Sequence, residues 1–338
     1  MNLQLNVSLK PYNTFGIDVK ASKFVRFNTV QELQELLRHP EVLHEDKLVL
    51  GGGSNMLFTH DFEGVVLQNG IHGIEIVNDQ EEYTLVKAGG GVVWQEFVLY
   101  ALEKNLGGVE NLSLIPGTVG ASPLQNIGAY GVELKDVFHE LETVHIASGK
   151  IEKFTNADCG FGYRESVFKN KLKGQYIVTS VTFKLRKKHI LNTTYGAITD
   201  TLKEMQVQQP TIQDVSAAVC QIRRSKLPDP AQIGNAGSFF KNPEISLEQY
   251  NVLKEQYPAM PSYPVSETTV KVPAGWLIEQ CGWKGKVIDN YGVHKNQALV
   301  LVNYGGASGN HIRQLALDII SSVKDKFGIQ LNPEVNII

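Results

Sequence analysis

The chain has 338 residues, more than one ordinary domain core accommodates, so we expect two or three domains. Hydrophobic residues make up 42% of the chain, and its 32 basic side chains nearly balance its 35 acidic ones. This composition is typical of a soluble globular protein and does not favour a protein that binds duplex nucleic acid or a membrane surface. The three cysteines, Cys159, Cys220 and Cys281, are far apart, which excludes a simple disulfide framework and a two-cysteine zinc knuckle. We therefore expect buried thiols and no metal site.

The first twenty positions mix polar residues such as Asn2, Gln4 and Lys10 among the apolar ones, so they lack the apolar core of a secretory signal. No apolar run approaches the roughly 20 residues that a membrane helix needs. We therefore expect a chain that starts near Met1, does not enter a membrane and works in the cytoplasm.

The first half of the chain alternates strand and helix patterns. The spacing of apolar residues predicts strands at Lys23–Phe27, Lys47–Leu50, Val65–Leu67 and Tyr83–Lys87. It predicts helices that begin at Thr29, with Glu32 three residues on, and that cover Val92–Lys104. Residues Gly107–Gly131 form an irregular, glycine-dense stretch.

In the second half we predict strands at Leu141–Ile146, Tyr176–Leu185 and Leu299–Val302, the last of them buried. Helices are predicted from Thr211, which can cap the helix that ends in Arg223, Arg224 and Lys226, and at Leu247–Gln256, Ala274–Gln280 and Ser308–Phe327. Leu227-Pro228-Asp229-Pro230 reads as a linker. The closing residues Glu334–Ile338 resemble a strand that must pair with a sheet formed earlier in the chain.

Three stretches crowd small residues more than a simple turn requires. They are Gly51-Gly52-Gly53-Ser54-Asn55, Gly89-Gly90-Gly91 and Pro116-Gly117-Thr118-Val119-Gly120-Ala121. Small residues let backbone N–H groups approach an oxyanion, so each stretch is a candidate phosphate cradle, although a turn that ends a strand explains any one of them alone. The chain contains neither a nucleotide triphosphate loop nor the Rossmann glycine pattern. Any dinucleotide is therefore bound by another scaffold.

The segment Gln125-Asn126-Ile127-Gly128-Ala129-Tyr130-Gly131 follows the third glycine stretch. Its amide side chains and its aromatic ring suit a flat ring with hydrogen-bonding groups, such as isoalloxazine or adenine. A polar loop over a hairpin explains the same residues equally well.

Three further residues could carry chemistry, each with an ordinary structural alternative. Arg164 follows two glycines and can present its guanidinium fork to a carboxylate, or it is a surface arginine. Ser238 has small residues before it and Phe239 and Phe240 after it, without the surroundings of a nucleophilic triad, so a proton donor or a plain loop serine is expected. Glu334 follows Pro333 in an apolar segment where partial burial favours the neutral carboxyl, or it is a solvent-facing carboxylate.

From Asn13-Thr14-Phe15-Gly16-Ile17 to Glu334, the ordered set of these motifs resembles the UDP-N-acetylenolpyruvoylglucosamine reductase family. The resemblance implies an α+β, non-Rossmann FAD-binding fold of the vanillyl-alcohol-oxidase type in two subdomains, with a C-terminal α+β substrate-binding domain. It implies the boundaries 1–75 with 328–338, then 76–226, then 227–327. The implied activity is the reduction of UDP-N-acetylglucosamine enolpyruvate to UDP-N-acetylmuramate, with non-covalent FAD and with NADPH as hydride source, in peptidoglycan precursor synthesis.

The resemblance also implies roles for single residues. It makes Arg164, Ser238 and Glu334 catalytic, as substrate cation, proton donor and carboxyl acid. Its implied substrate contacts are Tyr163, Tyr195, Lys226, Asn242 and Lys271, of which Tyr195, Lys226 and Asn242 hold the diphosphate. Its implied flavin contacts are Gly51, Gly52, Gly53, Ser54, Asn55, Pro116, Gly117, Thr118, Gly120, Ala121, Gln125, Asn126, Gly128, Tyr130, Gly131 and Arg223.

Two other functions stay open from the residues. The first is an FAD-linked oxidase of an alcohol or sugar with the same flavin domain, and the second is a nucleotide-sugar binding protein without redox activity, which would be colourless. Many such oxidases tether flavin through a histidine near the first glycine loop, whereas Gly51–Asn55 contains none. We expect a monomer.

Overall fold

The computed structural model describes residues 2–338, which form two compact units. Unit 1 contains residues 2–7 together with Ala21–Gly52 and Glu63–Arg223. Unit 2 contains Ser8–Lys20, Gly53–Phe62 and Arg224–Ile338. The chain therefore passes between the units several times, and the three-segment division expected from the sequence stays a prediction.

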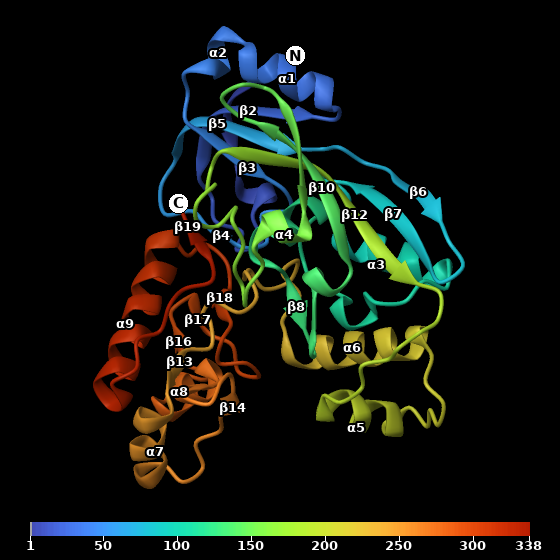
Figure 1. Ribbon diagram of the computed structural model, residues 1–338. Coiled ribbons are helices and arrows are strands. Elements are labelled where there is room, and N and C mark those ends of the chain that lie inside the picture. Colours follow the sequence, from blue (N-terminus) through green and yellow to red (C-terminus); the bar gives the residue numbers. More distant parts are fainter. Residues whose placement is uncertain (1) are drawn as a thin grey trace. The chain divides into compact units, whose positions relative to one another are not determined.

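The largest sheet of unit 1 is antiparallel and five-stranded, in the order β11-β10-β12-β7-β6 (Figure 1). Its strands are β6 (Ile74–Asp79), β7 (Tyr83–Gly89), β10 (Phe138–His145), β11 (Ile151–Thr155) and β12 (Tyr176–Arg186). Helix α3 (Trp94–Glu103) packs against it, and the rings of Trp94, Phe97 and Phe183 have centroids 4.3 to 5.8 Å apart. These aromatic residues form the centre of the larger apolar core.

A second, four-stranded sheet has the order β1-β2-β5-β3. Its strands are β1 (Gln4–Ser8), β2 (Lys20–Phe27), β3 (Lys47–Leu50) and β5 (Phe62–Asn69). Helices α1 (Val30–Arg38) and α2 (Pro40–Leu43) bury Leu33, Leu36 and Leu37 against Val25 and Val65. Thr29 caps α1, since its side chain accepts from the N–H of Glu32, as the sequence predicts.

Several short elements lie between the strands of the five-stranded sheet in sequence. They are α4 (Asn156–Cys159), the strands β8 (Gly128–Ala129) and β9 (Val132–Glu133), and the 3₁₀ helices η2 (Glu110–Leu112), η3 (Val119–Gln125) and η4 (Leu134–Asp136). Helices α5 (Gly196–Glu204) and α6 (Ile212–Lys226) bury Ile198 and Leu202 against Val215 and Val219, and Figure 1 shows them side by side. The predicted cap of α6 is confirmed, because Thr211 and Asp214 exchange hydrogen bonds.

Unit 2 is built from short strands and three helices of at least seven residues within residues 8–338. Its elements are η1 (Lys10–Tyr12), β4 (Met56–Leu57), β13 (Glu244–Ser246), α7 (Leu247–Gln256), β14 (Tyr263–Pro264), β15 (Thr269–Lys271), α8 (Ala274–Gln280), β16 (Val287–Ile288), β17 (Tyr291–Val293), β18 (Leu301–Asn303), α9 (Gly309–Phe327) and β19 (Asn336–Ile337). Two three-stranded sheets have the orders β13-β15-β14 and β16-β17-β18. The predicted helices α7, α8 and α9 are confirmed.

Two predicted strands of unit 2 are shorter than expected, because their first residues pair elsewhere. Strand β18 starts at Leu301, since the Leu299 carbonyl accepts from Phe239 and Val300 bridges Ser238. The closing strand is only β19, which pairs in parallel with β4. Pro333 and Glu334 pair instead with the segment at Phe239 and Phe240.

Within residues 2–338, no helix combines the length and apolar character needed to cross a membrane. Cys159 is buried, and burial raises the pKa of its thiol to about 12, so it is an inert packing residue.

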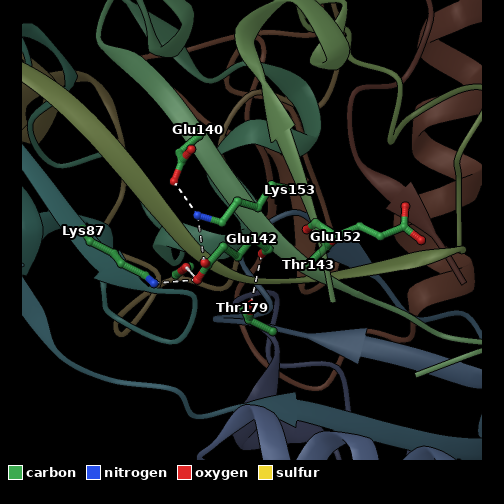
Figure 2. A network of polar contacts seen from close by, with 8 residues as sticks. Lys87, Glu140, Glu142, Thr143, Glu152, Lys153 and Thr179 are labelled. Carbon is green, nitrogen blue, oxygen red and sulfur yellow. Dashed lines mark hydrogen bonds and ion pairs between the residues drawn. The ribbon is translucent and has the colours of Figure 1, made fainter. Parts of the chain in front are cut away.

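A polar network joins four strands of the large sheet, β7, β10, β11 and β12 (Figure 2). Glu142 on β10 lies 2.5 Å from Lys87 on β7 and 3.4 Å from Lys153 on β11, and it accepts from the hydroxyl of Ser180 on β12 at 3.0 Å. Burial opposes the ionisation of Glu142, but the hydrogen bonds from Lys87 and Ser180 and the lysine charges outweigh it and hold the pKa of Glu142 below its usual value.

We predict that Glu142→Gln lowers the melting temperature at pH 7 and that its difference from the unaltered protein shrinks as the pH falls. A carboxylate with a lowered pKa stabilises the fold above its ordinary value of 4.5, and this stabilisation is lost as the pH falls through the folded-state pKa. Thermal melts between pH 7 and pH 3 test this, with the exposed Glu75→Gln on β6 as control. A difference that does not change with pH contradicts the assignment.

Candidate functional site

Gly51 and Gly52, the part of the first glycine stretch that belongs to unit 1, lie against the third stretch. A Cβ atom at Gly51 would lie 2.5 Å from the hydroxyl of Thr118, and one at Gly52 would lie 3.4 Å from the Cα of Gly117. Among residues 2–338, the N–H groups of Gly52, Gly117 and Thr118 donate to no protein acceptor. Backbone donors gathered beside small residues can hold an oxyanion such as a pyrophosphate.

The second glycine stretch has a different role. The N–H groups of Gly89, Gly90 and Gly91 donate to the carbonyls of Gly73, Thr179 and Ile71. Cβ atoms at these three positions would lie within 2.4 to 2.7 Å of neighbouring atoms. The expectation that this stretch cradles a phosphate is therefore wrong. Its glycines allow close backbone packing. The Gly90 carbonyl accepts from the N–H of Gly120 at 2.9 Å, and this hydrogen bond holds the third stretch in place.

The third stretch continues through η3 into the loop at Asn126. Asn126 is fully buried with a left-handed backbone, and its amide donates to Glu133 and to the Gly162 carbonyl while it accepts from Lys135. Its side chain is thus engaged in holding the loop. Recognition of a flat ring would fall to its neighbours, namely the partly buried Gln125, Gly128 and Tyr130 and the exposed Gly131, or to their backbone groups.

Arg164 sits in a tight turn closed by mutual backbone hydrogen bonds of Gly162 and Glu165. Its backbone is left-handed, with φ of 55°, which is a strained conformation for a residue with a Cβ. Its guanidinium donates to the Gly128 carbonyl at 2.7 Å and lies 5.5 Å from the ring centroid of Tyr163. Arg164 is therefore held against the loop that precedes Tyr130.

A second cation of unit 1, Arg223, lies close enough to Arg164 to feel its charge. Arg223, near the end of α6, hydrogen-bonds the Tyr130 hydroxyl and donates to the Leu114 carbonyl at 3.3 Å. Burial lowers the pKa of Arg223, and the nearby charge of Arg164 adds to that shift, while burial raises the pKa of Tyr130. Tyr195 packs edge-on against Tyr130 with centroids 5.3 Å apart. Two guanidinium groups and two phenol rings in one place suit an anionic ligand that also has a flat part.

In unit 2, Ser238 and Glu334 lie on adjacent backbone segments. The Phe239 carbonyl accepts from the N–H of Glu334 at 2.7 Å, and Ser238 bridges Val300 on its other side. Both Ser238 and Glu334 are partly buried. Asn55, at the end of the first glycine stretch, donates its amide to the Glu334 carbonyl at 3.2 Å. Asn55 therefore has a structural role next to the expected acid.

Of the expected substrate residues, Asn242, Lys271 and Lys226 lie in unit 2. Asn242 accepts from the N–H of Ala274 at the start of α8, and Lys271 pairs with Glu244 at 3.4 Å on the adjoining strands β15 and β13. Lys226 is exposed at the end of α6, and its backbone accepts a hydrogen bond from His294. Tyr195 lies in unit 1, where it precedes α5 and is 46% exposed.

Sequence reasoning missed the asparagines that fix these loops, above all Asn111 and Asn192 in unit 1 and Asn235 in unit 2. Asn235 accepts from the N–H of Gly237 and so shapes the turn before Ser238. The only signal for them was a polar residue within a glycine-rich or irregular stretch. No group of three His, Cys, Asp or Glu residues in the range 2–338 has the arrangement of a metal site.

Gly53 and Gly16 make a matched pair for testing the first stretch, since both have positive φ, 60° and 66°. A Cβ at Gly53 would lie 1.9 Å from the Tyr12 carbonyl oxygen, whereas one at Gly16 meets nothing within 4 Å. We predict that Gly16→Ala costs about 1 kcal/mol of unfolding free energy, from left-handed strain alone. Gly53→Ala should cost roughly 3 kcal/mol or more.

Urea unfolding of both variants measures this difference. Equal losses for the two alanines would show that the close approach of Gly53 to Tyr12 does not constrain the loop.

Two regions of the chain match models of known protein families. Residues 21–155 match the family model of the FAD binding domain, and residues 229–338 match that of the UDP-N-acetylenolpyruvoylglucosamine reductase C-terminal domain. A protein of Flavobacterium johnsoniae named UDP-N-acetylenolpyruvoylglucosamine reductase is 50% identical over 339 residues, covering 100% of both chains. A protein of the same name from Chromobacterium violaceum is 48% identical over 99% of this chain and 98% of its own.

Solved structures agree in fold. The crystal structure of UDP-N-acetylenolpyruvylglucosamine reductase from Thermus caldophilus matches with a TM-score of 0.69 at 23% identity, over 100% of this chain and 99% of that one. The 6-hydroxy-D-nicotine oxidase of Arthrobacter nicotinovorans matches with a TM-score of 0.54 at 13% identity, over 97% of this chain and 86% of that one. The expected α+β flavin-domain fold is confirmed. Because relatives with about half of their residues identical cover its whole length, the chain belongs to the UDP-N-acetylenolpyruvoylglucosamine reductase family.

Proposed function

We propose that the protein reduces UDP-N-acetylglucosamine enolpyruvate to UDP-N-acetylmuramate, with non-covalent FAD as cofactor and NADPH as reductant. The observation that carries this proposal is the full-length identity of 50% to a relative named for this reductase activity. A step in peptidoglycan precursor synthesis follows from that activity.

The residues of unit 1 fit FAD. The N–H groups of Gly52, Gly117 and Thr118 offer donors to a pyrophosphate where a side chain at Gly52 would meet the backbone of Gly117. No histidine lies within Gly51–Asn55, which agrees with a flavin that is not covalently attached. When bound, FAD would supply the hydride chemistry between NADPH and the substrate.

The polar residues suit the charge that develops on the substrate. Hydride addition to an enol ether conjugated to a carboxylate drives negative charge onto that carboxylate. A fixed cation and a neutral acid bind this charge more strongly in the transition state than in the ground state, and so accelerate the reaction. We assign the cation to Arg164, which its turn and the Gly128 carbonyl hold in place, and the acid to Glu334, whose backbone is fixed by Phe239 and Asn55.

Ser238 is assigned as the proton donor to the carbon next to the site of addition. A serine is a weak acid in water, but a carbanion-like acceptor is basic enough to take its proton. Gly237, with φ of 69°, and the buried Phe239 and Phe240 fix the backbone on both sides of the hydroxyl. A rigid donor of this kind needs little reorganisation when the proton is transferred.

The other substrate and flavin contacts are proposed from the family resemblance. We propose that Tyr163, Tyr195, Lys226, Asn242 and Lys271 contact the substrate and that Arg223 lies by the flavin. NADPH and substrate would bind in turn, which gives ping-pong kinetics. We further propose a cytoplasmic monomer that binds no nucleic acid, and the near balance of 32 basic and 35 acidic side chains supports the last point.

We predict that Ser238→Ala leaves flavin reduction by NADPH within about threefold of the unaltered enzyme but slows flavin reoxidation by the substrate by roughly 10²- to 10⁴-fold, the usual range for a lost proton donor. Anaerobic stopped-flow measurement of the two half-reactions tests this. Ser246→Ala, which removes only the cap of α7, is the control and should leave both rates unchanged. Equal losses in both half-reactions would refute the role of Ser238.

A further inference from the structure

Asn111 lies inside unit 1, on η2, with 1% of its surface exposed. Its amide nitrogen donates two hydrogen bonds, to the Tyr130 carbonyl at 3.1 Å and to the Asn192 carbonyl at 2.8 Å. These acceptors are 62 positions apart in the chain (192 minus 130), so a single side chain ties two distant segments together. One segment is the loop of Tyr130, and the other leads directly to Tyr195.

A reciprocal bond and a ring contact complete this connection. The amide of Asn192 donates to the Gly131 carbonyl at 3.0 Å and accepts from Thr194, while the ring of Tyr195 packs edge-on against Tyr130. The first hydrogen bonds of α5 then form at the Tyr195 carbonyl, which accepts from Ile198 at 2.8 Å and from Thr199 at 3.4 Å. The start of α5 and the place of Tyr195 therefore depend on how residue 192 is held.

The oxygen of the Asn111 amide points to a positioning role. Among residues 2–338, this buried atom has no hydrogen-bond partner. An unsatisfied buried acceptor destabilises a fold. The unpaired oxygen of Asn111 is therefore unfavourable unless the two hydrogen bonds from its amide nitrogen have a compensating role. The two carbonyls that it meets also fix its orientation, since only the nitrogen can donate to both.

We propose that Asn111 is a positioning residue that locks the segment of Tyr195 to the Tyr130 loop and so sets the affinity for the diphosphate of the nucleotide sugar. The proposal rests on the proposed function for the ligand, but the lock itself is a property of unit 1. It adds to the proposed site a residue that acts by holding the segments of Tyr130 and Tyr195 together.

Two substitutions separate hydrogen bonding from space filling. Asn111→Asp keeps the shape of the side chain but replaces the donating nitrogen with a carboxylate oxygen that faces both carbonyls, whereas Asn111→Ala removes both bonds and leaves a small void. If the donors matter, the aspartate variant is at least as impaired as the alanine variant. If Asn111 only fills space, the alanine variant is the worse of the two.

The first readout does not depend on activity. Hydrogen exchange of the amides of Ile198 and Thr199 should speed up roughly tenfold or more in both variants, because the start of α5 detaches more often. Thr143→Val is the control, since it removes a fully buried hydroxyl bond between β10 and β11 outside this region and should leave these amides unchanged. Unchanged exchange at Ile198 and Thr199 in the Asn111 variants overturns the lock.

The second readout concerns the substrate. Both Asn111 variants should raise the half-saturating concentration of UDP-N-acetylglucosamine enolpyruvate in flavin reoxidation by about tenfold. The rate of reoxidation at saturation and the rate of flavin reduction by NADPH should stay within about threefold of those of the unaltered enzyme. If hydrogen exchange at Ile198 and Thr199 is faster but the half-saturating substrate concentration is unaltered, the positioning role is overturned. If the unaltered enzyme is not reoxidised by this compound, the proposed function fails, while the exchange data still decide whether the lock exists.

Asn192→Ala gives an independent check should Asn111→Asp not fold. It removes the reciprocal bond to Gly131 and should show the same pattern of exchange and half-saturation. A normal pattern in Asn192→Ala together with a normal pattern in Asn111→Ala overturns the proposal.

Discussion

Close backbone-to-backbone packing of glycines is the constraint on which the cofactor side of unit 1 depends. Gly90 packs against the backbone near Val178 and accepts from Gly120, and Gly52 packs against Gly117. A Cβ at Gly90 or Gly120 would clash with a neighbouring atom, so the chain can form these contacts only without side chains there. The result is an arrangement in which Gly89–Gly91 use their N–H groups for folding, whereas the N–H groups of Gly52, Gly117 and Thr118 donate to no acceptor within residues 2–338.

Asparagine side chains extend this order into regions without long helices or strands. Asn126 holds the loop after η3, Asn111 and Asn192 hold the surroundings of Tyr130, and Asn235 shapes the turn before Ser238. Each replaces a ladder of backbone bonds with two or three side-chain bonds, which suits loops that present functional groups. Preorganisation of this kind keeps Arg164 and Ser238 in place before any ligand binds.

Elements with local signals could be predicted well from the sequence. Helices α7, α8 and α9 begin and end within one residue of the predicted bounds, and Thr29 and Thr211 cap as expected. The fold class and the family followed from the order of the motifs. Strand ends that depend on distant hydrogen-bond partners could not be predicted from the sequence. Strand β18 and the closing strand are shorter than predicted because the segment Ser238–Phe240 pairs with the residues before them.

The same limit applied to the site. From composition, Gly89–Gly91 was indistinguishable from the other two glycine stretches, because what separates them is whether carbonyls of distant strands accept their N–H groups. Asn111 and Asn192 carried only the weak signal of a polar residue in an irregular stretch, since the acceptors of their amides lie far away in the sequence. Local chemistry thus indicated candidate groups for a site, and only the tertiary structure showed which of these groups are already engaged in holding the fold.

The central claim is that electrons from NADPH pass through a bound flavin to a nucleotide-sugar enol ether. The most direct test reduces the flavin of the purified protein with NADPH in the absence of oxygen. UDP-N-acetylglucosamine enolpyruvate is then added, and the flavin absorbance is followed at about 450 nm. The account predicts that the absorbance returns rapidly on addition of this compound. Recovery only after oxygen is admitted would contradict it in favour of an oxidase, and protein without flavin would contradict it in favour of a binding protein.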